Sequence, residues 1–269
     1  MSLFKRQVFL QIGPAGEVGK SFAGFRIGFT VKMSASSTPN TATLEAYNLN
    51  DATLALAQRS DCVVRLLAGY DVPRLLFQGN PVKDGVRKER KGVDNVLTIE
   101  ASDGGKAYKE ARVSVGFATA TTLRQVFDAV AVQTGLPSGT IRIPENVSFP
   151  HGITLAGNAR DVLDRLALAS GSQWFVRDGA LQFVGVGEDT GEQAIVFSSA
   201  AGNLIGSPTK KDGGVSVKAL LAPTLRPGKV FKVESRDLTG FYTATDVEFT
   251  GDSGFDSPFY VVAVGKPRG

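Results

Sequence analysis

The sequence predicts a mainly β fold with an α+β insertion. Two stretches, one at each end of the chain, show the period-two alternation of apolar and polar residues that is typical of half-buried strands. Helical periodicity is confined to the middle of the chain. The composition agrees, since 17 Phe and 31 Gly stand against a single Trp and two Met, which favours short strands joined by turns over a helical bundle.

Alternation begins close to the N-terminus. Val8, Leu10 and Ile12 alternate with more polar neighbours and predict a first strand. A cleaner apolar face follows, and its members are Phe25, Ile27, Phe29 and Val31. Further strands are expected at 42–48, 63–68, 74–78 and 93–101, with a short helix capped by Asn50 or Asp51 between the first two. We therefore expect a β domain over residues 1–111.

The middle of the chain changes to helical spacing. Thr122 and Gln125 have the spacing of a capping box, and the apolar stripe that follows ends at Gly135. Asn158 opens a second helix that ends before Gly171. Asp178-Gly179 is a two-residue turn of the kind that joins hairpin strands, here 173–177 and 180–184. Residues 112–187 are therefore expected to form a small α+β module.

The last part of the chain, residues 188–269, returns to strand patterns. Strands are expected at 194–198, 215–221 and 229–234. One face of a later strand is predicted to hold Phe241, Thr243, Thr245, Val247 and Phe249, and one face of the last strand Phe259, Val261 and Ala263. This is a second expected β domain.

Several classes of protein are excluded by composition. No run of about 18 apolar residues occurs and the N-terminus lacks the features of a signal peptide, so membrane insertion is not expected and synthesis in the cytoplasm is. Cys62 and His151 are single residues of their types, so an internal disulfide and a zinc cage are excluded. No cofactor or metal is expected.

The formal charge of +4 is concentrated near the N-terminus, where residues 1–111 hold 15 Lys and Arg against 11 Asp and Glu. Five of these cations lie close together, and they are Lys83, Arg87, Lys88, Arg90 and Lys91. They are candidate interaction residues for an acidic partner or a nucleic acid. Because carboxylates are interspersed, a solvated ribbon between two strands is the more ordinary interpretation.

The string Gly13-Pro14-Ala15-Gly16-Glu17-Val18-Gly19-Lys20-Ser21 resembles a phosphate-binding loop. Its spacing is wrong, because the position five residues before Gly19 is Pro14. Its context is wrong as well, since such a loop must lead into a helix, whereas a strand follows. A hairpin connection is expected instead.

No catalytic residue is predicted. His151 lies in a turn without a nucleophile motif, and Cys62 begins an apolar strand, where a buried thiol is the usual outcome. Carboxylates that a glycosidase could use are present, but they have capping or linker explanations, and they are Asp161, Asp164, Glu188, Asp189 and Glu192. Core positions are predicted for Phe25, Phe29, Phe127 and Phe249, while Trp174 could belong to the core or to a stacking platform.

The order of motifs along nearly the whole chain resembles baseplate hub proteins of tailed, particularly contractile-tailed, bacteriophages. The segments that carry the resemblance are Tyr47-Asn48-Leu49, Val64 to Tyr70, Leu76 to Gly79, Glu100 to Gly104, the helix with Phe127, Leu163 to Trp174 with Asp178-Gly179, Leu225-Arg226-Pro227-Gly228, Gly240-Phe241-Tyr242 and Gly251-Asp252. The resemblance depends on the shared order of these segments along the chain.

The resemblance implies two tail-tube-like β-barrel domains flanking the helix-containing module. It implies a non-enzymatic structural protein of the virion tail baseplate, assembled in the host cytoplasm as a homotrimer. Such a hub joins the tail tube to the central spike, contacts other baseplate proteins and surrounds a channel through which DNA passes without specific binding. Two alternatives stay open, a tail-associated peptidoglycan hydrolase and a single-stranded nucleic-acid-binding β-barrel protein.

Overall fold

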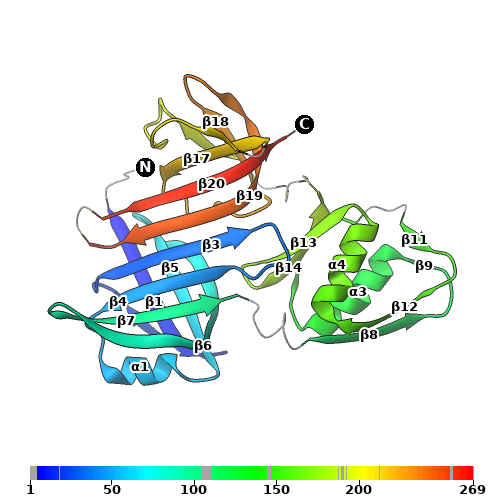
Figure 1. The fold of residues 1–269 in the computed structure, drawn as a ribbon, viewed down its shortest axis with the longest axis horizontal. Coiled ribbons are helices and arrows are strands. Elements are labelled where there is room, and N and C mark those ends of the chain that lie inside the picture. Colours follow the sequence, from blue (N-terminus) through cyan, green and yellow to red (C-terminus); the bar gives the residue numbers. More distant parts are fainter. Residues whose placement is uncertain are drawn as a thin grey trace.

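The computed structural model describes residues 5–17, 19–103, 111–143, 147–186, 188, 191, 193–211, 213–254 and 257–268. Most of these residues lie in strands. Figure 1 shows two parts, a strand-rich body and a smaller module that contains the helices α3 (Leu123–Thr134) and α4 (Ala159–Ala169). We call the first part the β body and the second, residues 111–143 and 147–186, the α+β module.

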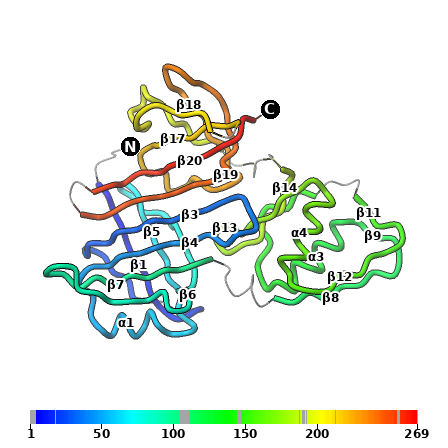
Figure 2. The backbone as a smooth tube through the Cα atoms, viewed as in Figure 1, coloured from blue at the N-terminus to red at the C-terminus, as the bar shows by residue number. Residues whose placement is uncertain are grey.

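The β body is built from both ends of the chain. Its N-terminal strands are β1 (Arg6–Pro14), β2 (Lys20–Phe22), β3 (Ile27–Ser34), β4 (Thr41–Tyr47), β5 (Cys62–Tyr70), β6 (Arg74–Lys91) and β7 (Asp94–Ser102), with helix α1 (Asp51–Ala57) between β4 and β5. Its C-terminal strands are β15 (Ile195–Ser198), β16 (Thr209–Lys211), β17 (Gly214–Leu220), β18 (Val230–Glu234), β19 (Thr239–Asp252) and β20 (Phe259–Pro267). The tube trace in Figure 2 follows the chain out of the body into the module and back.

The two ends meet through the antiparallel pair β3 and β19, which sets Val31 opposite Phe249. The resulting 13-stranded sheet runs in the order β16-β17-β20-β19-β3-β4-β7-β6-β5-β1-β2, with β18 branching from β19 and β15 from β18. Among the described residues no pairing joins β16 to β2, so the sheet is open. The mainly β class with a helix-containing insertion is confirmed, and the two expected barrel-like units share this one open sheet.

The α+β module has three small sheets around its helices. Its strands are β8 (Arg112–Phe117), β9 (Thr121–Thr122), β10 (Ser138–Ile141), β11 (Ser148–Phe149), β12 (Ile153–Asn158), β13 (Ser172–Arg177) and β14 (Ala180–Gly185). The capping box of Thr122 and Gln125 is formed, and Gly135 ends α3 in the left-handed conformation, with φ of 72°. Asn158 caps α4 by accepting a hydrogen bond from the backbone N–H of Arg160. Both predicted helix starts are therefore confirmed.

Each part has its own apolar core. Buried residues from both terminal segments, from Val8 to Ala263, form one cluster, and residues between Val113 and Phe183 form the other. The predicted boundaries at 111 and 187 stay a prediction, and the packing adds that the two terminal segments share a core.

One predicted core position and one predicted strand face are wrong. Phe25 is 41% exposed, because β3 begins only at Ile27 and Phe25 lies in the preceding loop against the edge of Phe22. Phe241 is 49% exposed although Val247 and Phe249, on the same predicted face, are buried. A register shift between Ala244 and Asp246 adds one residue to β19, which moves the earlier residues to the opposite face.

Candidate functional site

One face of the large sheet is polar and open. In β3, Ile27, Phe29 and Val31 are buried in the core, whereas Thr30 and Lys32 point to the opposite side. The strand registers extend this polar face in rows, of which one is Tyr260, Thr250, Thr30, Thr43 and Glu100 across five neighbouring strands. We call the side of β6, β7, β4, β3, β19, β20 and β17 that faces away from the core the open face.

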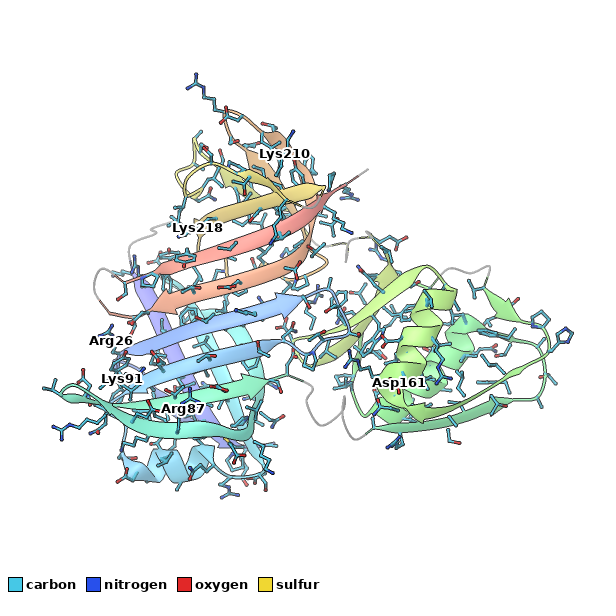
Figure 3. The ribbon with its side chains drawn as sticks, viewed as in Figure 1. Arg26, Arg87, Lys91, Asp161, Lys210 and Lys218 are labelled. Atoms are coloured by element: carbon cyan, nitrogen blue, oxygen red, sulfur yellow. The ribbon has the colours of Figure 1, made fainter. Side chains whose placement is uncertain are left out.

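Four ion pairs cross the open face. Arg26 Nη2 lies 3.0 Å from Asp252 Oδ2, and Lys32 Nζ lies 4.0 Å from Glu248 Oε2. Arg87 Nη1 lies 2.8 Å from Glu100 Oε1, and Lys91 Nζ lies 2.7 Å from Glu45 Oε1. Figure 3 shows Arg26, Lys91 and Arg87 one below another at one end of the sheet. These four cations of the open face thus have carboxylates within reach on nearby strands.

These ion pairs shift the pKa values of cations on the open face. Hydrogen bonding to Asp252 raises the pKa of Arg26, and Glu100 does the same for the pKa of Arg87. The hydrogen bond to Glu45 raises the pKa of Lys91. Farther along the sheet, Lys218 Nζ lies 3.8 Å from the centre of the Tyr260 ring, which is a cation–π contact. The charges of Arg26, Arg87 and Lys91 are thus compensated by the carboxylates that raise their pKa values.

The pairing of cations with carboxylates affects how strongly the open face can bind a polyanion. Binding to DNA is dominated by Lys and Arg contacts with phosphates, which release counterions. A cation already held by a carboxylate gains little from a phosphate, because its present partner must be given up. The paired cations of the open face therefore add little affinity for a polyanion.

The five predicted interaction residues lie on β6, but they do not form one patch. Arg87 and Lys91 belong to the open face, whereas Lys88 Nζ pairs with Asp51 of α1 at 2.7 Å on the other side. Arg90 Nε donates to the carbonyl of Gly92 at 3.2 Å, and Lys83 is exposed near the shift in register between Pro81 and Val86. Their role in binding a partner stays a prediction.

The strand that carries them is longer than expected. Sequence patterns predicted a strand at 74–78 and a ribbon from Lys83, whereas β6 is continuous from Arg74 to Lys91. Residues Arg74–Gly79 pair with β5, and Asn80–Lys91 pair with β7. One strand therefore connects the two layers of the β body.

The glycine-rich string is a hairpin connection, as predicted. It joins β1 to β2, and the next element along the chain is strand β3 rather than a helix. A Cβ atom on Gly13 would lie 2.4 Å from the Cα of Gly19, so the two backbones approach too closely for a side chain. The string has no phosphate-binding geometry.

The other residues that were weighed as catalytic or stacking candidates lie at positions with a structural explanation. His151 is exposed in a turn, and Cys62 is buried, where burial raises the pKa of its thiol. Trp174 belongs to the core of the module and donates its indole N–H to Asp164 at 2.7 Å. Asp161 lies in the first turn of α4, and Asp189 and Glu192 lie outside the described residues. No helix in the described part of the chain is long and apolar enough to cross a membrane.

The free edges of the sheet differ in how they are protected. Beside β15, Asn203 takes the place of a further strand, because its side chain accepts from the N–H of Ser198 and donates to the carbonyl of Val196. In the described residues no second strand pairs with β16 or with Asn80–Lys91 of β6. Because unpaired edges invite association with another chain, these two are candidate subunit contacts.

Comparison with solved structures shows which known proteins share this architecture. The 43 kDa tail protein of prophage MuSo2 from Shewanella oneidensis is 11% identical, with a TM-score of 0.65 over 98% of this chain and 98% of that chain. The chain has the fold of phage tail proteins. A tail protein from Neisseria meningitidis MC58 agrees, at 9% identity and a TM-score of 0.68 over 98% of this chain and 97% of the other.

The phage tail fold extends to secretion systems. An Escherichia coli component of the type VI secretion system, described as structurally similar to the T4 bacteriophage tail proteins gp27 and gp5, is 9% identical, with a TM-score of 0.61 over 96% of this chain and 77% of the other. No family model and no curated protein matches the sequence. The fold expected from the order of motifs is thus confirmed by structural similarity at sequence identities of 9% to 11%.

Proposed function

We propose that the protein is a structural, non-enzymatic hub component of a phage tail baseplate, and that it joins the tail tube to the central spike. The observation that carries the proposal is the open face: a continuous, ion-paired sheet surface in a chain whose fold matches phage tail proteins over nearly its whole length. A surface that must let DNA pass needs many polar groups and few uncompensated cations. The open face is then part of the wall of the DNA channel.

The proposed assembly is a homotrimer in the virion tail, built in the host cytoplasm and in contact with tube, spike and other baseplate proteins. Three copies with two similar sheet units each would match a six-fold tube. The strands of the open face lie side by side in a row. The edge of β16 lies on one side of this row, and the Asn80–Lys91 edge of β6 lies on the other. Contacts between unlike edges are heterologous, and repeated around an axis they close a ring.

Two measurements test the proposal. The mass of the purified protein, alone and with tube and spike proteins, should be that of a trimer or of a trimer-containing complex. In a Cys62→Ser background, Arg90→Cys combined with Lys210→Cys should give disulfide-linked multimers, since these exposed residues lie on the two edges. Asp161→Cys with Asp237→Cys is the matched control, because both residues are exposed away from the edges. A chain that stays monomeric at high concentration with every partner would overturn the proposal.

A further inference from the structure

The α+β module meets the β body at the tip of one hairpin. Figure 1 shows β13 and β14 reaching from the module to the ends of β3 and β4. The tip is the turn Asp178-Gly179, whose φ angles of 51° and 80° are those of a tight hairpin turn. Because the two apolar cores share no residue, this contact does not extend either core.

The first polar contact at the tip is made by Asn40, from the loop between β3 and β4. Its backbone N–H donates to Asp103 Oδ1 at 2.8 Å, and its Nδ2 donates to Asp103 Oδ2 at 2.7 Å. The same Nδ2 donates to the carbonyl of Val176 in β13 at 2.9 Å. Asn40 and Asp103 are only 4% and 3% exposed, so this contact with the hairpin is shielded from water.

The second contact is made by Arg226, which is 6% exposed. Its Nε donates to both carboxylate oxygens of Asp178, at 3.1 and 3.2 Å. Its Nη1 donates to the carbonyls of Pro223 and Leu225, and its Nη2 donates to the carbonyl of Leu75 in β6. One guanidinium therefore ties the hairpin turn to a body loop and a body strand.

We propose that these two contacts form a latch that sets the orientation of the α+β module, and that the module can leave the β body as a folded unit when the latch opens. An interface held by directional polar bonds has one well-defined geometry when closed, and the apolar cores on its two sides are separate. Relative motion is the general expectation for parts of a chain joined in this way. The inference does not depend on the tail function.

The latch also brings together two segments of the motif order that lie far apart in sequence. Asp178-Gly179 and Arg226-Pro227-Gly228 meet at this point, beside Asp103 from the end of β7. A partner that offers a carboxylate to Arg226 or a carbonyl to Asn40 would compete with the hairpin. Binding of such a partner at the latch can thus change the orientation of the module.

Distances between spin labels test the proposal. Labels at Asp161→Cys on the module and Lys210→Cys on the body, in a Cys62→Ser background, should give a single narrow distance distribution; Figure 3 shows both positions. Asn40→Ala with Asp178→Ala should add a second population. Hydrogen exchange of α3 and α4 should stay as slow as in the parent, because the core of the module is its own. Arg124→Ala, which removes the exposed pair of Arg124 with Asp128 inside α3, is the control and should change nothing in the distances.

Two outcomes would overturn the latch. The first is an unchanged distance distribution in the double variant. The second is a broadened distribution accompanied by fast exchange throughout α3 and α4, since the contacts would then be needed for folding of the module. Arg226→Lys keeps the charge but cannot reach all the acceptors of the guanidinium. It should show a smaller second population, and it provides the same test if the double variant does not fold.

Discussion

Lys91 on β6 and Glu45 on β4 are joined at 2.7 Å although β7 lies between their strands. The ion pair reaches over a strand, so it exists only because three strands are aligned in one register. The open face is made of such contacts between strands, and its electrostatic neutrality is a property of the folded sheet.

Removing the carboxylates of the open face should create affinity for DNA. In Glu45→Gln with Glu248→Gln, Lys91 and Lys32 lose their partners and become available to phosphates. We expect oligonucleotide binding that is absent from the parent and that weakens as salt rises, with the logarithmic slope growing by about 0.9 for each duplex phosphate contacted. Fluorescence anisotropy over a salt series measures both.

The control for this experiment changes the net charge equally at other sites. Glu17→Gln with Asp237→Asn alters two exposed carboxylates in turns outside the open face. If this control binds DNA as strongly as the open-face variant, net charge alone is responsible and the ion pairs have no special role.

Two phenylalanines should differ sharply in their contribution to stability. Phe127 is fully buried in the module, 4.8 Å from the ring centre of Phe183, whereas Phe241 is 49% exposed. Phe127→Ala should lower the free energy of unfolding by about 3–5 kcal/mol, because it leaves a cavity. Phe241→Ala should cost roughly 0.5 kcal/mol or less, as exposed substitutions usually do. Urea denaturation of both variants measures the difference, and equal losses would contradict the register shift in β19.

Asp103 should make stability depend on pH. Burial raises the pKa of its carboxyl to about 7, and the hydrogen bonds from Asn40 offset this only in part. Between the ordinary pKa of 3.8 and about 7, the folded chain keeps a proton that the unfolded chain has lost. The stabilisation is therefore complete below the lower value and is lost as pH rises, with a slope of up to about 1.4 kcal/mol per pH unit.

Asp103→Asn removes this titration. Across this range the stability of the parent should fall relative to that of the variant as pH rises, and above the upper pKa, where the parent carboxylate is fully ionised, the difference between the two should become constant. Denaturation midpoints of both proteins at intervals of pH measure this difference. Parallel pH profiles for the two proteins would show that Asp103 titrates at its ordinary pKa in the folded chain.

Asn203 should protect the edge of β15. Asn203→Ala removes the side chain that bonds Ser198 and Val196, which leaves two backbone groups of an edge strand without that partner. We expect a loss of about 1–3 kcal/mol in unfolding free energy and new concentration-dependent association. Denaturation and light scattering measure the two effects, while Thr209→Ala on exposed β16 should alter stability far less. A variant as stable and as monodisperse as the parent would show that Asn203 does not guard the edge.

Local features of the fold were predictable from the sequence because nearby residues determine them. Thr122 with Gln125, Asn158, and the turn at Asp178 all act within a few positions along the chain. The position of Phe241 was not predictable in this way, since the extra residue in β19 appears only when the register against β20 is known.

The open face and the latch were out of reach for a different reason. Asp252 follows Arg26 by 226 positions, and Leu75 precedes Arg226 by 151. Polar residues with such distant partners look like ordinary surface residues in the sequence. The cluster from Lys83 to Lys91 was visible as charge, but its division between two faces depends on β6 being one continuous strand.

The pairing of β3 with β19 has a consequence for synthesis on the ribosome. One edge of β3 stays unpaired until β19, more than 200 residues downstream, has been synthesised; Phe249 then lies opposite Val31. The apolar core of the module in between is formed only by residues between Val113 and Phe183, so the module can fold while the chain is still growing. During translation the nascent protein therefore carries a finished insert beside an incomplete sheet, and that exposed strand is the place where chaperones would be needed most.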